Sequence, residues 1–234
     1  MSLEIILIPL AIALVTKAQS KAKENTPNNS SHQIAVETRM KNLELLQNAT
    51  KDVAPHLSDG TLFVSESTSY PGTLRELIIP LVNELKNSDT KNLYFASAPE
   101  RVNPGDPIWD QKNTPRLYAG LTPSASKRTR DFYSTFCDNL VEVSSPEVAE
   151  AAKLFENTFR QVNIALVNEF AQIAHALGIS VYETLDAAAT KPYGFMKFMP
   201  SAGVGGHCIP VDPSYLADTA ARVGVPATFI ERAN

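Results

Sequence analysis

The sequence has few cysteines, no long apolar run and no excess of positive charge, and each shortage excludes a class of protein. Two cysteines among 234 residues cannot build a disulfide framework, so we expect a reduced compartment, the cytoplasm. Lys and Arg number 21 against 25 Asp and Glu, a net charge of −4 that argues against a nucleic-acid binder. With 44% hydrophobic and 20% charged residues, the composition is that of a globular domain.

The apolar run Ile5–Val15 is well short of the ~20 residues that a membrane span needs, and Pro9 interrupts it. Glu4 is the only charge before it, whereas a secretory signal begins with a basic region. We therefore expect a buried strand and its exit here, and no membrane partner; a signal or anchor segment is the alternative reading. The polar stretch Lys17–Gln33 indicates a loop or a locally disordered insertion over residues 15–35.

Up to residue 145, short strand-like runs alternate with helical patterns. Alternation of this kind is typical of an α/β domain with a mostly parallel sheet. The expected strands are Thr61–Val64, Asn92–Ala96, Arg116–Ala119 and Asn139–Val143, and the expected helices are Val36–Leu57, Leu74–Leu85 and Ser124–Cys137.

The pattern changes at Pro146. The stretch Val148–Leu177 contains no Gly or Pro and predicts one long helix. Two further helical segments follow, Ser180–Ala189 and Asp212–Val223, with a glycine-rich loop between them. We therefore predict an all-helical second part over residues 146–234.

The long helix carries two distinct faces. Its apolar stripe recurs at helical spacing and predicts core packing. The other face is rich in Asn, a mediocre helix former, which leaves two interpretations open: a solvated face, or a polar face turned toward a ligand. The stripe consists of Phe155, Phe159, Val162, Leu166, Phe170 and Ile173, and the polar face of Lys153, Asn157, Arg160, Ile164 and Asn168.

The glycine-rich loop leads directly to Cys208. Its glycines, Gly203 and Gly205 among them, let a ligand approach the backbone closely. Asp212 and Pro213 have the residue types of a helix cap and first helical position, which predicts Cys208 just ahead of a helix N-terminus. A thiolate there could add to a carbonyl, but an inert cysteine in a structural loop is an equally open reading.

Cys137 differs from Cys208 in its surroundings. It follows an apolar segment and is predicted to lie in the core.

Four segments, taken in order, resemble motifs of the UDP-glucose/GDP-mannose dehydrogenase family, the nucleotide-sugar 6-dehydrogenases. They are Glu66–Thr73 (ESTSYPGT), Ala98–Gly105 (APERVNPG), Ala149–Arg160 (AEAAKLFENTFR) and Gly203–Pro213 (GVGGHCIPVDP). The resemblance spans about Ser58–Asn234, and the last motif is most similar to the branch that oxidises UDP-N-acetyl-hexosamines. It implies a partial Rossmann-like, NAD-binding domain over residues 1–145, followed by a long helix and a helical central domain.

The resemblance also implies an activity and its residues. The family uses NAD, without a metal, to oxidise the C6 alcohol of a UDP-sugar to a carboxylate for polysaccharide biosynthesis, through a thiohemiacetal and a thioester on the cysteine. It further implies a homodimer formed through the long helix. The implied catalytic residues are Cys208, Lys153, Asn157, Asp212, Thr68 and Glu100. The implied cofactor contacts are Thr68, Glu100 and Ser67. The implied substrate contacts are Lys153, Asn157, Arg160, Lys197, Ser201, Gly203 and Gly205.

The chain departs from the family pattern at both ends. It contains no G-x-G-x-x-G fingerprint, residues 15–35 match nothing in the family, and it stops where a second nucleotide-binding domain would follow. We therefore expect a truncated chain with poor NAD affinity. Two alternatives stay open: a non-catalytic relic or dimerisation partner of a full-length dehydrogenase, and an unrelated cysteine hydrolase using His32, His56 or His175 as base.

Overall fold

The computed structural model describes residues 5–7, 31–103, 105–203 and 208–233. The chain divides into two compact units, Met1–Asn29 with Glu37–Leu154, and Ser30–Val36 with Phe155–Asn234. The first is an α/β unit and the second is helical.

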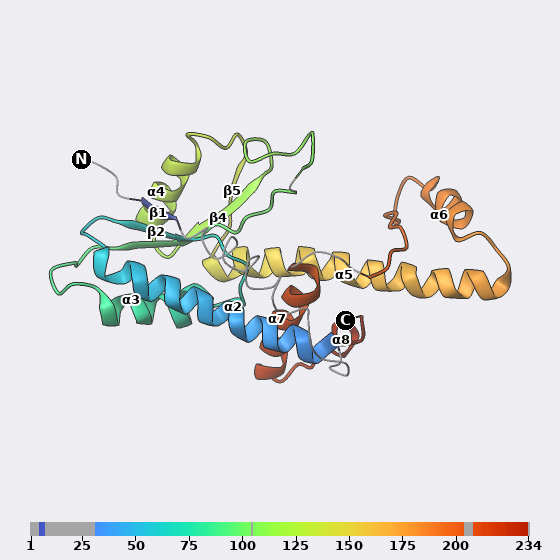
Figure 1. Cartoon of the computed structure of the whole chain (residues 1–234). Helices are drawn as coiled ribbons and strands as arrows, with labels where there is room; N and C mark the ends of the chain where they lie inside the picture. The colour runs from blue at the N-terminus through green and yellow to red at the C-terminus, as the bar shows by residue number, and fades with distance from the viewer. Residues whose placement is uncertain (1–4, 8–30, 104, 204–207, 234) are drawn as a thin grey trace. The chain divides into compact units, whose positions relative to one another are not determined.

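Among its described residues, the first unit contains a five-stranded sheet in which the strands follow one another in chain order, and Figure 1 labels four of them. The first three strands are parallel, the fourth runs antiparallel to the third, and the fifth is parallel to the fourth. Three of the four pairings are therefore parallel, which confirms the prediction of a mostly parallel sheet. The strands are β1 (Ile5–Leu7), β2 (Leu62–Ser65), β3 (Tyr94–Ser97), β4 (Arg116–Gly120) and β5 (Leu140–Glu142).

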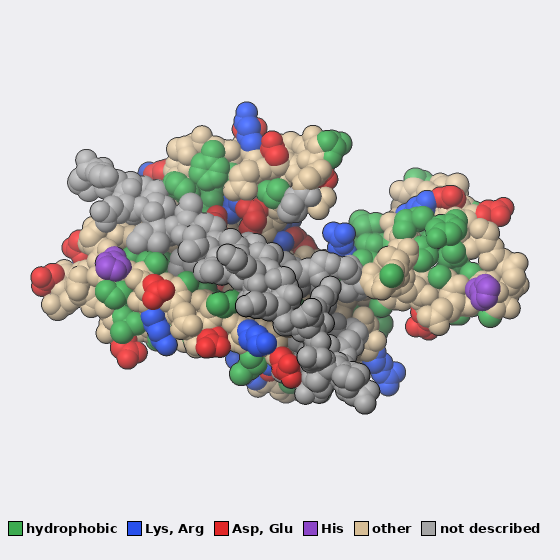
Figure 2. All heavy atoms as spheres, in the orientation of Figure 1, with side chains coloured by type: hydrophobic (Ala, Val, Ile, Leu, Met, Phe, Trp, Pro, Cys, Tyr) green, Lys and Arg blue, Asp and Glu red, His purple; other side chains and the backbone are tan. Residues whose placement is uncertain are grey.

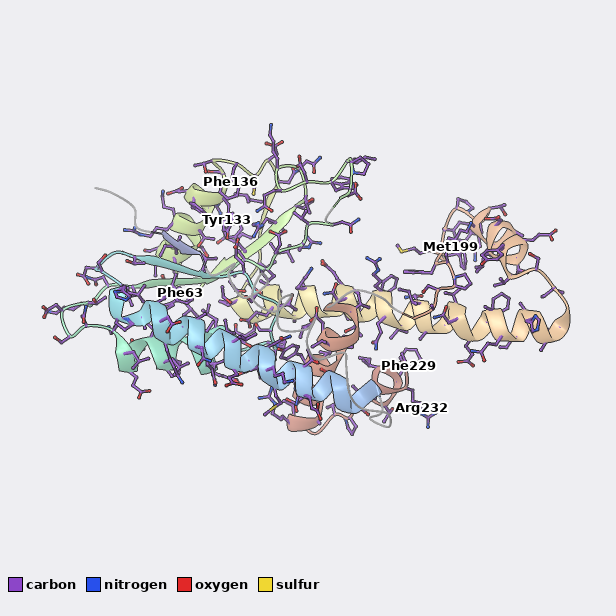
Figure 3. The ribbon with its side chains drawn as sticks, in the orientation of Figure 1. Phe63, Tyr133, Phe136, Met199, Phe229 and Arg232 are labelled. Atoms are coloured by element: carbon purple, nitrogen blue, oxygen red, sulfur yellow. The ribbon has the colours of Figure 1, made fainter. Side chains whose placement is uncertain are left out.

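Helices cover both faces of this sheet because alternate side chains of a strand point to opposite sides. Phe63 of β2, labelled in Figure 3, packs in one cluster with helical side chains such as Leu46 and Ile78. Its neighbours Leu62 and Val64 pack on the other side with Tyr133. The first face is covered by α2 (Ser31–Val53), the 3-10 turn η1 (Ala54–His56), the π-helical turn η2 (Leu74–Ile78) and α3 (Ile79–Leu85), and the second by α4 (Pro123–Tyr133).

Gly120 lets β4 and α4 approach one another. A Cβ built on Gly120 would lie 2.2 Å from the backbone nitrogen of Ser126, so no larger residue fits there without a backbone shift. Thr122 then caps α4 by accepting a hydrogen bond from Ala125 N at 3.1 Å. A tight strand-to-helix turn thus begins α4.

One expectation for the N-terminal third needs correction. Helix α2 begins at Ser31, so the last residues of the predicted loop Lys17–Gln33 are helical. The strand predicted within Ile5–Val15 is confirmed by β1, and the rest of that run falls among residues 8–30, which lie outside the described part. Helix α4 also ends at Tyr133, four residues earlier than expected, and leaves Cys137 buried just beyond it, as predicted for a core cysteine.

The helical unit contains most of the long helix α5 (Pro146–Leu177), together with α6 (Val181–Ala189), α7 (Cys208–Arg222) and α8 (Thr228–Arg232). Ser145 and Ser180 begin α5 and α6, since their hydroxyls accept from Val148 N and Glu183 N. No helix in the described residues is long and apolar enough to cross a membrane.

Helix α7 begins earlier than predicted. It starts at Cys208, so Asp212 is no N-terminal cap and Pro213 lies inside the helix. The reason is that Asp212 is buried and accepts a hydrogen bond from Asn157 instead of capping its own helix. Pro213 has no N–H to give to the carbonyl four residues before it, so this helix tolerates one missing hydrogen bond.

The apolar stripe of α5 is not core, contrary to the prediction. Phe155 and Leu166 are 65% and 64% exposed, and Phe159 and Ile173 are exposed as well. Figure 2 shows hydrophobic side chains gathered over α6 and the segment after it, where Met199, labelled in Figure 3, is also exposed. Such a contiguous apolar surface is unusual for a monomer.

Candidate active site

Two acidic residues and one arginine meet at the carboxyl edge of the parallel strands. Glu66 follows β2, Glu100 lies three residues after β3, and Arg116 begins β4, which runs in the opposite direction. The Arg116 guanidinium forms ion pairs with both carboxylates, at 2.8 Å to Glu66, and also donates to the Ala98 carbonyl at 3.1 Å. In open α/β sheets this edge is where ligands bind.

Arg116 is only 4% exposed and is held from a second direction by Tyr133. The guanidinium lies 4.7 Å from the centre of the Tyr133 ring, and the Tyr133 hydroxyl donates to Glu66 at 2.5 Å. Burial, followed by the charge of Glu66, raises the pKa of Tyr133, so its hydroxyl stays protonated and remains a donor. The arginine therefore has a fixed position between its two carboxylates.

Glu100 uses both carboxylate oxygens. Oε1 accepts from the backbone nitrogens of Arg101 and Val102, at 2.6 and 2.7 Å, while Oε2 pairs with Arg116. Burial alone would raise the pKa of Glu100, but the Arg116 charge and the two backbone N–H groups outweigh it, and the pKa lies below its usual value. Glu100 is thus an ionised, firmly oriented carboxylate rather than one tuned to exchange protons near neutral pH.

The loop after β2 carries Ser67 and Thr68, both partly buried. The Ser67 and Ser69 hydroxyls are buried without a hydrogen-bond partner in the described part of the chain. An unpaired buried hydroxyl costs free energy unless a ligand or water satisfies it, so Ser67 fits a contact to a bound cofactor. The same loop turns at Gly72, whose φ of 103° favours glycine.

A buried carboxylate from α5 holds the far end of this loop. Glu150 is 2% exposed, and its two oxygens accept from Gly72 N at 2.7 Å and from Leu74 N at 3.1 Å. Burial raises the pKa of Glu150 to about 7, although the two N–H groups act in the opposite direction. The amide of Leu74, which begins η2, and that of Gly72 just before it are therefore already paired with a carboxylate.

In the helical unit, two predicted residues contact one another. Asn157 of α5 donates from Nδ2 to Asp212 Oδ2 of α7 at 2.5 Å, across 55 positions of sequence. A second asparagine of the same helix, Asn168, accepts from Ser201 N at 2.8 Å, and the Ser201 hydroxyl donates to the Gly203 carbonyl. The polar face of α5 thus makes specific hydrogen bonds to the segments on either side of the glycine loop.

The remaining predicted residues are less engaged. Lys197 forms an ion pair with Asp186 of α6, Arg160 is exposed, and Lys153 is partly buried on α5. Gly205 and the side chain of Cys208 lie outside the described residues. In the part of the chain that the structure describes, no cluster of His, Cys, Asp and Glu could hold a metal ion.

Together, a mostly parallel sheet with a polar carboxyl edge and a long helix bonded to a cysteine-bearing segment are features of a two-domain nucleotide-dependent dehydrogenase. Family models give the specific assignment. Residues 16–137 match the NAD binding domain of the UDP-glucose/GDP-mannose dehydrogenase family, and residues 147–234 match its central domain. The chain belongs to this family, as its motifs predict, and the first match confirms NAD as the expected cofactor. The match also corrects one expectation, because it includes most of residues 15–35.

The similar proteins of known name support the family assignment. The chain is 37% identical over 177 residues to UDP-N-acetyl-D-mannosamine dehydrogenase of Methanocaldococcus jannaschii, covering 75% of this chain and 40% of the relative. It is 37% identical over 190 residues to UDP-N-acetyl-D-glucosamine 6-dehydrogenase of Pseudomonas aeruginosa, covering 80% and 44%. The solved UDP-D-ManNAc dehydrogenase of Pyrococcus horikoshii superposes with a TM-score of 0.72 at 35% identity, covering 82% and 46%. The chain thus spans less than half the length of these relatives.

Sequence reasoning did not identify Arg116 and Tyr133 as residues of the site, and it did not identify the capping role of Glu150. A signal exists for the first, since an arginine inside a strand-like run must find partners when it is buried. Glu150 lies in one of the four family motifs, but the backbone N–H of Gly72 that it binds is 78 positions away in the sequence. No local sequence pattern indicates such a contact.

Proposed function

We propose that this chain carries the catalytic residues of an NAD-dependent nucleotide-sugar 6-dehydrogenase, which oxidises the C6 alcohol of a UDP-N-acetyl-hexosamine to a carboxylate. The observation that carries the proposal is the hydrogen bond between Asn157 and Asp212, which links α5 to the helix that begins with Cys208. The names of the relatives support the substrate class. The proposed compartment is the cytoplasm.

Residues of the first unit would hold the cofactor. Ser67 and Thr68 lie after β2, and the unpaired Ser67 hydroxyl offers a hydrogen bond at the edge where a nicotinamide would lie. NAD, when bound there, would supply the hydride acceptor that the oxidation at C6 requires. Glu100, ionised and oriented by Arg116, would orient the water that hydrolyses the last intermediate.

Cys208 would keep the intermediate bound to the enzyme. After the alcohol loses a hydride and a proton, the thiolate adds to the aldehyde carbon and forms a thiohemiacetal. Loss of the second hydride from C6, together with the hydroxyl proton of the thiohemiacetal, leaves a thioester. Water then attacks the thioester carbon, the C–S bond breaks, and the products are the carboxylate and the free cysteine.

Lys153 and Asn157 would stabilise the negative charge that develops on the C6 oxygen. An amide nitrogen carries two N–H groups, so Asn157 can hold Asp212 with one and donate the other to the substrate. Asp212 fixes the orientation of that amide, and as a base it can assist the hydrolytic step. Arg160, Lys197, Ser201, Gly203 and Gly205 remain proposed substrate contacts.

The test is the yield of NADH per UDP-N-acetyl-mannosamine consumed. We expect two NADH per sugar for the wild-type chain, and no turnover beyond the first oxidation for Cys208→Ser. Cys137→Ser is the matched control, because Cys137 is buried in the core of the first unit and should leave the yield unchanged. A full NADH yield from Cys208→Ser would contradict the mechanism.

A second candidate function is a dimerisation partner without catalysis of its own. The observation that favours it is the exposed apolar stripe of α5, beside a cavity of 710 Å³ between α5, α6 and the segment after α6. A second copy covering this surface would remove it from water. Size-exclusion chromatography should show a dimer that Leu166→Glu converts to a monomer. Met40→Glu, at an equally exposed apolar position of α2, should leave it dimeric. A dimer that binds neither NAD nor UDP-sugar would favour this candidate over the enzyme.

A further inference from the structure

The loop that carries Thr68 and the helix that carries Lys153 are joined by Glu150. On α5, Glu150 precedes Lys153 by three residues, so the two side chains lie on neighbouring positions of the helix surface. Its carboxylate reaches the other end of the loop, where it accepts from Gly72 N and Leu74 N. A single side chain thus spans two proposed parts of the active site.

The two hydrogen bonds have the properties of a strong anchor. They are charge-assisted when the carboxylate is ionised, they are shielded from water, and they fix two backbone positions at once. The glycine turn allows the approach: Gly72 has a positive φ, and a Cβ there would lie 3.0 Å from Glu76 Oε1.

Other described contacts fix the loop less firmly. Ser67 and Ser69 are the residues on either side of Thr68, and their hydroxyls have no partner in the described part of the chain. Within the turn, Thr73 bonds back to the Tyr70 carbonyl through its nitrogen and its hydroxyl, at 3.0 and 2.6 Å. These bonds close the turn on itself but do not tie it to α5.

A buried carboxylate is a costly way to cap a helical turn, because desolvation opposes its charge. A neutral cap would stabilise the fold at lower cost, so a cap with this cost suggests a second role. We propose that Glu150 is a positioning residue whose carboxylate fixes the Thr68–Thr73 loop against α5 and thereby sets Thr68 relative to Lys153. This inference rests on the proposed function for its catalytic consequence, but not for the anchoring.

The test compares Glu150→Gln with Glu147→Gln. Glu147 is one turn earlier on α5 and pairs at 2.8 Å with Arg75 of η2, so the control removes a contact between α5 and η2 at a less buried position. Gln at position 150 keeps one acceptor and turns an N–H donor toward the other backbone N–H. At pH 8, the amides of Gly72 and Leu74 should exchange with deuterium about tenfold faster in Glu150→Gln and unchanged in Glu147→Gln. Unchanged protection in Glu150→Gln would overturn the proposal.

Steady-state kinetics on the same proteins tests the catalytic consequence. We expect kcat of Glu150→Gln to fall about tenfold while KM for the UDP-sugar changes less than about twofold, because the loop is misplaced but substrate contacts remain. An unchanged kcat together with faster exchange would refute the positioning role. If the wild-type chain shows no turnover, the proposed function fails, and the exchange result still decides the anchoring. If Glu150→Gln does not fold, Glu150→Asp, one methylene shorter, gives the same exchange comparison.

Discussion

Glu150 should make the stability of the first unit fall as the pH rises. Its pKa is raised from 4.5 to about 7 in the folded chain, chiefly by burial. A group with a raised folded pKa contributes its stability below the unfolded pKa, and that contribution is lost as the pH rises through the folded pKa. A shift of this size corresponds to about 3 kcal/mol at most, of which about 2 kcal/mol falls between pH 5 and pH 8.

Urea unfolding of wild type and Glu150→Gln at pH 5 and pH 8 isolates this contribution. Trp109 is the only tryptophan of the chain and lies in the same unit as Glu150, so its fluorescence reports the relevant transition. From pH 5 to pH 8, the free energy of unfolding of the variant should rise by about 2 kcal/mol relative to wild type.

The comparison between proteins is essential, because other carboxylates act in the opposite sense. Glu100 and Glu147 have lowered pKa values, despite burial that acts to raise them, so they stabilise the fold as the pH rises. These groups are common to wild type and Glu150→Gln, so they cancel in the difference. A relative change below about 0.5 kcal/mol, or one of opposite sign, would show that Glu150 is not a buried carboxylate titrating near neutrality.

Two further predictions concern packing in the first unit. Arg116→Met should lower the free energy of unfolding by about 3 kcal/mol or more, because it leaves Glu66 and Glu100 without their buried counter-charge. The control is Lys127→Ala, which breaks an exposed ion pair with Asp131 and should change the free energy of unfolding by less than about 1 kcal/mol. Gly120→Ala should cost about 3 kcal/mol in the same urea assay, because its Cβ would lie 2.2 Å from Ser126 N and the turn would have to open; a loss within 0.5 kcal/mol would contradict that close approach.

The strands and helices of the first unit were predictable because local patterns produce them. Alternation along Leu62, Phe63 and Val64 places side chains in two different clusters, and the turn residues between strands mark their ends. The reversed direction of β4 was not predictable in this way. Strand direction depends on how a long connection returns to the sheet, which hydrophobic period does not encode.

The candidate site likewise has features that the sequence predicted and features that it did not. Asn157 and Asp212 could be named from motifs, and the structure brings them into contact. The start of α7 could not, since Pro210 and Pro213 read as interruptions of a helix and only the buried contact of Asp212 overrides that local signal. The exposed stripe of α5 was misjudged for a related reason: periodicity shows that a helix has an apolar face but not what covers it.

The position of Glu150 also bears on how the chain could bind a dinucleotide. Helix N-termini after parallel strands commonly hold phosphate groups through their free N–H groups. At η2 the amides of Gly72 and Leu74 already donate to a carboxylate, so a phosphate there would face a second anion and find no free donor among these two. The pyrophosphate of NAD therefore needs N–H donors other than these, and the loop after β2 is left to serve the nicotinamide end. Protonation of Glu150 below about pH 7 would remove the negative charge but not the competition for the two amides, so lowering the pH should not turn this helix terminus into a phosphate site.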